Sequence, residues 1–183
     1  LVLTTAGGWG VVTADAVTSH PDLTLTTRPE DLLVAVDAMP PPRWRRNNPV
    51  DLAGGETRDT IPELLNLVAA HPGIDSILQL GLGIQGNTAA LTRRGPFHPD
   101  HGLERIVDYH ERQERRYAEA AAAASATYSK PILVASELAV AQPDNPMVTA
   151  VRESGRLCYA SADRAVAALG HMAWYAAWLR ARS

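Results

Sequence analysis

The sequence predicts a doubly wound parallel α/β sheet, with helices on both faces in a three-layer α/β/α arrangement. Short apolar runs alternate with helical patterns along the chain, and two of these runs, 1–4 and 74–80, lead into glycine-rich segments. The chain has 183 residues and is 46% apolar. That size and composition suit one globular core, so we expect residues 1–183 to form a single domain.

The periodicity predicts the following elements. We expect strands at 1–4, 23–26, 74–80, 131–135 and 156–159. The first helix should include residues 10–17. A capping box from Thr27 to Glu30 should start a helix that reaches Ala38, where prolines 40–42 end it. The next helix covers 58–71, with Ile61 and Leu65 on its apolar face.

Two helices are expected in the second half of the chain. Residues 102–128 should form a long crossover helix with an alanine-rich end, or alternatively an arm that binds a partner. Its charged residues, Glu114 among them, are expected away from the apolar face. The last helix should begin at Ser161 as N-cap. It should turn these residues inward: Val166, Leu169, Met172 or Ala173, and Ala176.

Composition limits the partners that we expect. The formal net charge of -3 argues against nucleic-acid binding, and the basic residues around Trp44 (Arg43, Arg45 and Arg46) are expected in a solvated loop. No apolar stretch approaches the roughly 20 residues of a membrane span. The single cysteine, Cys158, fits a reducing cytoplasm. Because the chain opens inside a strand without methionine, we expect a fragment of a longer multidomain protein.

The two glycine-rich segments are the best candidates for a binding site. Residues 5–10 read Thr-Ala-Gly-Gly-Trp-Gly, and residues 81–86 read Gly-Leu-Gly-Ile-Gln-Gly. A strand that passes through glycines into a helix presents unpaired backbone N–H groups and the positive helix end to an anion. The pair therefore predicts a phosphate-binding edge.

Other kinds of site fit the sequence less well. Residues 81–86 match the dinucleotide fingerprint, but the acidic residue that should follow about 20 positions later falls in a helix, at 104–108. A phosphate-binding loop of the NTPase type is absent, because the only lysine is Lys130. His98 and His101 lack a third metal ligand of suitable spacing. We expect no metal site and no catalytic residue in this chain.

Several blocks, in order along almost the whole chain, resemble the last flavodoxin-like domain of NDP-forming acyl-CoA synthetases, of the ADP-forming acetate–CoA ligase type. The blocks are 3–16 (Leu-Thr-Thr-Ala-Gly-Gly-Trp-Gly-Val-Val-Thr-Ala-Asp-Ala), 48–52 (Asn-Pro-Val-Asp-Leu), 130–134 (Lys-Pro-Ile-Leu-Val) and 161–169 (Ser-Ala-Asp-Arg-Ala-Val-Ala-Ala-Leu). The chain is also similar to the C-terminal domain of the succinyl-CoA synthetase β subunit. Thr5, Ala6 and Trp9 depart from the family's asparagine, glycine and proline.

The resemblance implies a C-terminal domain of an acyl-CoA ligase. In such enzymes an ATP-grasp module phosphorylates a histidine on another domain, which passes the phosphoryl group to a small carboxylate, and CoA attacks the acyl phosphate. This domain would supply half of the cradle for the phosphohistidine. ATP or ADP, Mg and CoA would serve the complete enzyme, with none bound tightly here. The partners would be the CoA-binding, histidine-bearing and ATP-grasp modules.

By position, the resemblance assigns phosphate or substrate binding to Thr5, Ala6, Gly7, Gly8, Gly10, Gly83, Ile84 and Gln85. It assigns a supporting loop to Asn48, Asp51, Gly54 and Gly55. The isolated domain is expected to be inactive. Two alternatives stay open: a non-catalytic docking or regulatory module of the same fold, and a nucleotide-binding oxidoreductase domain.

Overall fold

The computed structural model describes residues 1–27, 29–39, 48–54 and 57–182. Prolines 40–42, the basic cluster around Trp44 and Gly55 lie outside the described residues. Within them, five parallel strands form one sheet in the order β2-β1-β3-β4-β5. The strands are β1 (Val2–Thr4), β2 (Val50–Asp51), β3 (Ile77–Leu80), β4 (Ile132–Ala135) and β5 (Cys158–Tyr159). This order is that of flavodoxin, so the predicted fold class is confirmed.

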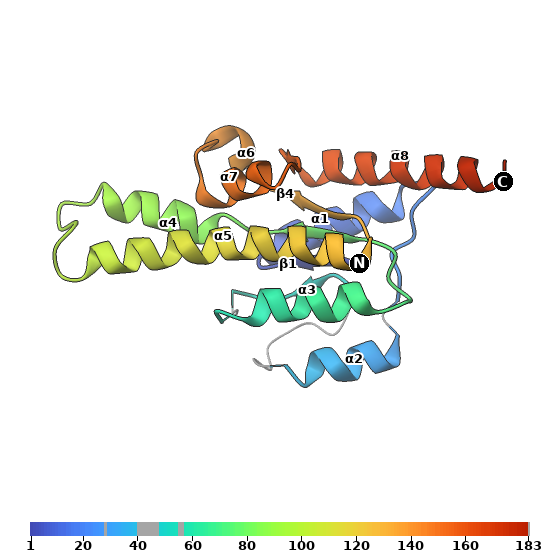
Figure 1. Ribbon diagram of the computed structural model, residues 1–183, viewed down its shortest axis with the longest axis horizontal. Helices are drawn as coiled ribbons and strands as arrows, with labels where there is room; N and C mark the ends of the chain where they lie inside the picture. The colour runs from blue at the N-terminus through green and yellow to red at the C-terminus, as the bar shows by residue number, and fades with distance from the viewer. Residues whose placement is uncertain (28, 40–47, 55–56, 183) are drawn as a thin grey trace.

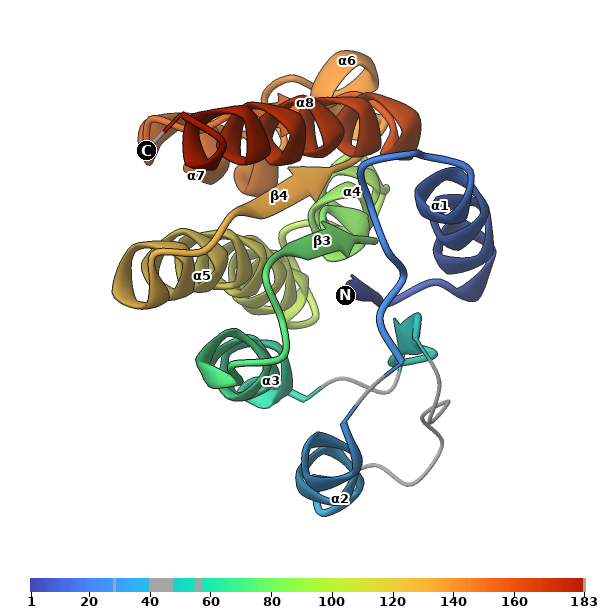
Figure 2. The same cartoon turned by 90° about the vertical axis from the view of Figure 1, so that its right-hand side faces the viewer.

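Helices cover both faces of the sheet (Figure 2). One face carries α1 (Gly7–Thr18) and α8 (Ala162–Arg180). The other carries α3 (Thr60–Ala70), α5 (Leu103–Tyr128) and α7 (Pro146–Glu153), with α2 (Glu30–Asp37) packed outside α3. The remaining helices are α4 (Ile84–Arg93) and the short α6 (Leu138–Ala141).

The hydrophobic core is divided by the sheet into two clusters. Successive side chains of a strand point to opposite faces, so Leu78 and Leu80 of β3 pack beneath α1 and α8, whereas Ile77 packs toward α3 and α5. All four residues of β3 are buried, as they must be in a strand covered on both faces.

Two expectations near residue 26 were wrong. Residues 23–26 form no strand, because Val50 and Asp51 take the place beside β1. The carbonyl of Thr26 instead accepts a hydrogen bond from the side chain of Asn48 at 3.0 Å. The capping box also does not form: α2 begins at Glu30 with Pro29 as N-cap, which puts Thr27 outside the capping position.

The last helix begins as predicted but is buried over a shorter length. Ser161 is the N-cap and accepts a hydrogen bond from the backbone N–H of Arg164, and Val166 and Leu169 are buried. Met172 is exposed and Ala176 only half-buried. The reason is visible in Figure 1, where the C-terminal part of α8 extends beyond the sheet.

The prediction did not include α6 and α7. The start of α7 nevertheless has a clear signal, because Asn145 caps it by accepting from the N–H of Met147 at 3.0 Å and Pro146 occupies the first turn.

In Figure 1, α4 and α5 lie side by side and project together beyond the rest of the molecule. No helix in the described part of the chain combines the length and apolar character needed to cross a bilayer.

Candidate functional site

The two glycine-rich loops meet at the carboxyl edge of the sheet. They follow β1 and β3, which are neighbours with Thr4 in register with Leu80. The hydroxyl of Thr5 donates a buried hydrogen bond of 2.7 Å to the carbonyl of Gly81. The structure therefore brings the loops together as predicted. It also gives Thr5 a structural role, because its side chain ties the loops and is buried.

The first loop leaves the start of α1 without a cap. The helix begins at Gly7, its N-cap Ala6 makes no side-chain capping bond, and no acidic residue lies in its first turn. The N–H of Ala6 itself donates to the hydroxyl of Thr4 at 3.0 Å. A Cβ at Gly8 would meet no described atom within 4 Å. Gly7 and Gly8 are therefore the positions of this loop best suited to receive an anion.

Gly10 serves packing. A Cβ on this residue would lie 3.0 Å from Cγ2 of Thr4 and 3.1 Å from Cβ of Pro49. Glycine thus lets α1 approach β1 and the start of β2 closely. Its N–H faces the carbonyl of Ala6 at 3.4 Å, within the helix.

The supporting loop at the end of β2 lies beside the first loop. Asn48 accepts a hydrogen bond from the N–H of Val2 at 2.9 Å, which fixes the start of β1. Asp51 accepts from the N–H of Ala53 at 2.8 Å, and its other carboxylate oxygen lies 2.6 Å from where a Cβ of Gly7 would be. Gly54 has a left-handed backbone, with φ of 66°. An acidic side chain thus lies beside the first loop.

The second loop is occupied by an internal carboxylate. Glu114 of α5 is 2% exposed and accepts hydrogen bonds from the N–H groups of Gly83, at 2.7 Å, and Gln85, at 2.8 Å. A carboxylate at a helix N-terminus satisfies the donors and the dipole as a bound anion would. An external anion would have to displace Glu114 to use these two N–H groups.

The burial of Glu114 corrects the expectation that it lies away from the apolar face. It stands seven residues after Val107 and seven before Ala121, both buried, which places it on the inward face of α5. That spacing was the available signal. The charge of Glu114 favoured the opposite prediction, because charged residues are seldom fully buried without a partner.

The other groups of the second loop are also engaged. The side chain of Gln85 contacts Nδ1 of His110 at 3.2 Å, and the carbonyl of Gly83 accepts from the Asn145 side chain at 3.1 Å. Gly83 has φ of 98°, a conformation that glycine adopts readily. Ile84, 43% exposed, presents its side chain at the surface.

A flavodoxin-like sheet with an uncapped, glycine-rich helix start at its switch point defines a class of α/β domain suited to phosphoryl ligands. Residues 1–86 match the Ligase-CoA domain family. The family resemblance read from the sequence is confirmed over that stretch, which contains both glycine-rich loops.

Solved structures share the fold over nearly the whole chain. PH0766 from Pyrococcus horikoshii OT3 is 19% identical with a TM-score of 0.66, over 92% of this chain and 33% of its own. The dinucleotide-forming acetyl-coenzyme A synthetase 1 of Ca. Korarchaeum cryptofilum (apo form) is 21% identical with a TM-score of 0.65, over 100% of this chain and 33% of its own. The chain thus spans about a third of the length of these proteins. No curated protein matches.

Proposed function

We propose that this chain is the C-terminal domain of an NDP-forming acyl-CoA ligase and provides one side of the cradle for a phosphohistidine and an acyl phosphate. The Ligase-CoA match over residues 1–86 and the fold shared with an acetyl-coenzyme A synthetase support this proposal. The observation that carries it is the uncapped start of α1 at Gly7 and Gly8, beside the switch point of the sheet.

The site that we propose is narrower than the resemblance implied. Thr5, Ala6 and Gly10 hold the first loop together through internal contacts, and Glu114 occupies the N–H groups of Gly83 and Gln85. The N–H groups of Gly7 and Gly8 therefore act as the phosphoryl donors. Phosphoryl transfer requires positioning and charge stabilisation, which fixed backbone donors provide without side-chain chemistry.

The rest of the reaction would take place with other modules. A histidine-bearing module would deliver the phosphoryl group to the first loop, an ATP-grasp module with Mg would charge that histidine, and a CoA-binding module would supply the thiol. A small carboxylate is the substrate. We place the protein in the cytoplasm, which suits its single, unpaired Cys158.

A docking or regulatory module of the same fold is the second candidate. The internal carboxylate at the second loop favours it, since Glu114 stabilises this loop without a ligand. The same observation weighs against the dinucleotide-binding alternative, because a pyrophosphate would need the N–H groups that Glu114 holds.

Substitution of Gly8 tests the proposal in the complete enzyme. Gly8→Leu adds a side chain where no described atom lies within 4 Å of a Cβ, so the fold should persist while access to the first loop is reduced. We expect acyl-CoA formation to fall about tenfold or more, a loss of about 1.4 kcal/mol in transition-state stabilisation. Asp15→Leu, further along α1 and exposed, is the control. Unchanged synthesis with Gly8→Leu would favour the docking module.

A further inference from the structure

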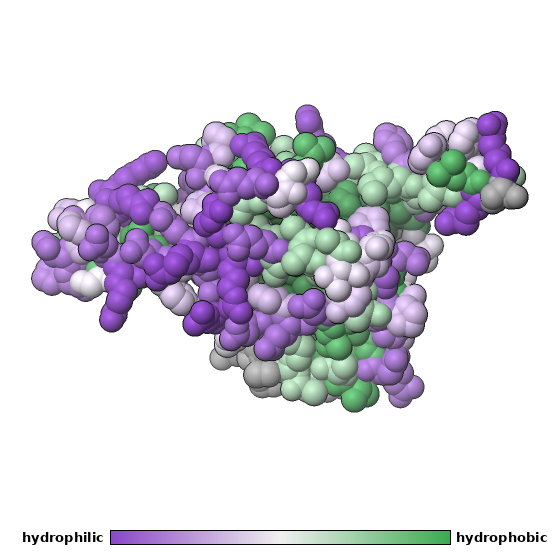
Figure 3. Space-filling view, in the orientation of Figure 1, coloured by the Kyte–Doolittle hydropathy of each residue, from purple (hydrophilic) through white to green (hydrophobic). Residues whose placement is uncertain are grey.

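A second polar feature lies away from the two loops, in a groove between the start of α3 and the middle of α5. Its volume is about 480 Å³. Four arginines line it, Arg58, Arg112, Arg115 and Arg116, against one carboxylate, Glu119. This composition stands out in a chain whose net charge is -3. Figure 3 shows hydrophilic side chains gathered over the α4 and α5 end of the molecule.

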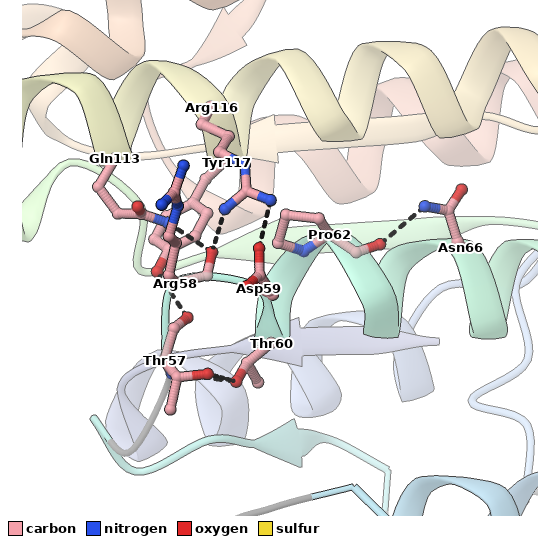
Figure 4. A network of polar contacts seen from close by, with 9 residues as sticks. All are labelled: Thr57, Arg58, Asp59, Thr60, Pro62, Asn66, Gln113, Arg116 and Tyr117. Carbon is pink, nitrogen blue, oxygen red and sulfur yellow. Dashed lines mark hydrogen bonds and ion pairs between the residues drawn. The ribbon is translucent and has the colours of Figure 1, made fainter.

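Two of these arginines are held in place by the protein. Arg116 donates to the carbonyl of Arg58 at 2.8 Å and pairs with Asp59 (Figure 4). Arg115 pairs with Glu153 at 2.5 Å. Arg115 also lies 3.8 Å from Glu119. A guanidinium group has five N–H donors, so these carboxylates leave some of them for another anion. Groups fixed before binding also lose less conformational entropy when a ligand arrives.

The other two arginines have exposed side chains. The guanidinium of Arg112 lies 4.0 Å from its nearest carboxylate partner, Asp108, and its side chain is 70% exposed. Among residues 57–182, no carboxylate forms an ion pair with Arg58. Figure 4 shows the Arg58 side chain directed toward α5, near Gln113 and Arg116. Cationic groups from α5 and from the turn before α3 thus line one groove.

The walls of the groove add an aromatic ring and a fixed backbone. Tyr109 is 45% exposed and lines the groove. The side-chain amide of Gln113 donates to the carbonyl of Arg58 at 2.6 Å, which holds the segment before α3 against α5. Arginine forks match phosphate oxygens, and a tyrosine ring can stack on a planar base.

We propose that this groove binds the phosphate groups of a pyrophosphate-containing small molecule. A multiply charged phosphate group suits it better than a single carboxylate does, because Asp59, Asp108, Glu119 and Glu153 already neutralise part of the arginine charge. The pyrophosphate could come from a nucleotide or from inorganic pyrophosphate. Tyr109 distinguishes the two, because only a nucleotide has a base to stack on it.

Titration calorimetry with ADP and with inorganic pyrophosphate tests the proposal. We expect saturable binding that Arg58→Gln and Arg112→Gln each weaken about tenfold, as loss of a hydrogen bond to a charged group implies. Arg105→Gln is the matched control, an exposed arginine of α5 outside the groove. If the ligand is a nucleotide, Tyr109→Leu should weaken the binding of ADP alone. If pyrophosphate suffices, the substitution should weaken the binding of neither probe.

Two results would overturn the proposal. One is no saturable binding of either probe, and the other is equal weakening of binding by Arg105→Gln and Arg112→Gln. The binding that Arg58→Gln and Arg112→Gln weaken should persist in the Gly8→Leu variant, because Gly8 does not line the groove. A site at the first loop and a site in this groove are therefore separable.

Discussion

The carboxylate of Glu114 accepts a hydrogen bond of 2.7 Å from the backbone N–H of Gly83. This contact joins the middle of α5 to the start of α4 and satisfies donors that the sequence pattern would leave to a phosphate. The edge of the sheet therefore has two different halves. At the first loop the helix start has no side-chain cap, although the Asp51 carboxylate lies beside it, and at the second the helix start holds its own anion.

Removing this carboxylate should destabilise the protein strongly. Glu114→Ala leaves two N–H groups without their acceptor in a buried setting, and we expect a loss of about 3 kcal/mol in the free energy of unfolding. Glu119→Ala, five residues along the same helix and exposed, should change it by less than about 0.5 kcal/mol. Urea unfolding followed by circular dichroism compares them. Equal stabilities would contradict the anchoring role of Glu114.

The Thr5 hydroxyl should stabilise the joined loops measurably. Thr5→Val keeps the shape of the side chain but removes the hydrogen bond to Gly81, so the free energy of unfolding should fall by about 1–2 kcal/mol. Thr5→Ser keeps the hydroxyl, so its free energy of unfolding should fall less. Thr18→Val removes an exposed hydroxyl bond at the other end of α1 and serves as control. If Thr5→Val is as stable as Thr18→Val, the crosslink has no energetic role.

Glycines of the two loops should respond in opposite ways to alanine. Gly81 has φ of 78°, and a Cβ there would overlap the Thr5 hydroxyl and lie 2.9 Å from the Thr5 nitrogen. We expect Gly81→Ala to lower the melting temperature, at a cost of about 2 kcal/mol or more. Gly8→Ala should be neutral or slightly stabilising, because the site is open and helical. Thermal unfolding of both proteins measures the contrast, and similar losses would contradict it.

The single cysteine should react slowly in the folded protein. Burial raises the pKa of the Cys158 thiol to about 11. At pH 8 only about one thiol in a thousand is then ionised, against roughly a quarter in an unfolded chain, so alkylation by iodoacetamide should be about 200-fold slower before denaturation. The rate should rise with pH toward about 11. Rapid labelling at pH 8 without unfolding would show that the thiolate is not suppressed.

Because the folded pKa of Cys158 is raised, the thiol contributes stability below its unfolded pKa that is lost as pH rises.

The main architecture was readable from the sequence because each signal was local. The apolar run 74–80 and the glycines after it placed β3 and its loop at the carboxyl edge. Ser161 correctly predicted the start of α8. The glycine loops met because parallel strands β1 and β3 are neighbours, which the flavodoxin order requires.

The remaining features depend on contacts between distant segments. Which residue of α5 faces the N–H of Gly83 depends on how the 30 intervening residues fold, so the sequence alone predicts Glu114 among the charges away from the apolar face. The strand expected at 23–26 lost its position to Val50–Asp51, a competition decided by pairing with β1. Met172 follows the apolar period of α8 but lies beyond the sheet, and no periodicity reports where the sheet ends.

A phosphate titration followed by amide NMR tests the asymmetry of the edge most directly. As inorganic phosphate is added, the amide resonances of Gly7 and Gly8 should shift with saturation, while those of Gly83 and Gln85 stay in place because Glu114 holds them. In Glu114→Gln the charge is lost and one acceptor is kept. The amide resonances of Gly83 and Gln85 should then begin to shift with phosphate. Unmoved resonances of Gly7 and Gly8 at saturating phosphate would contradict the proposed phosphoryl site.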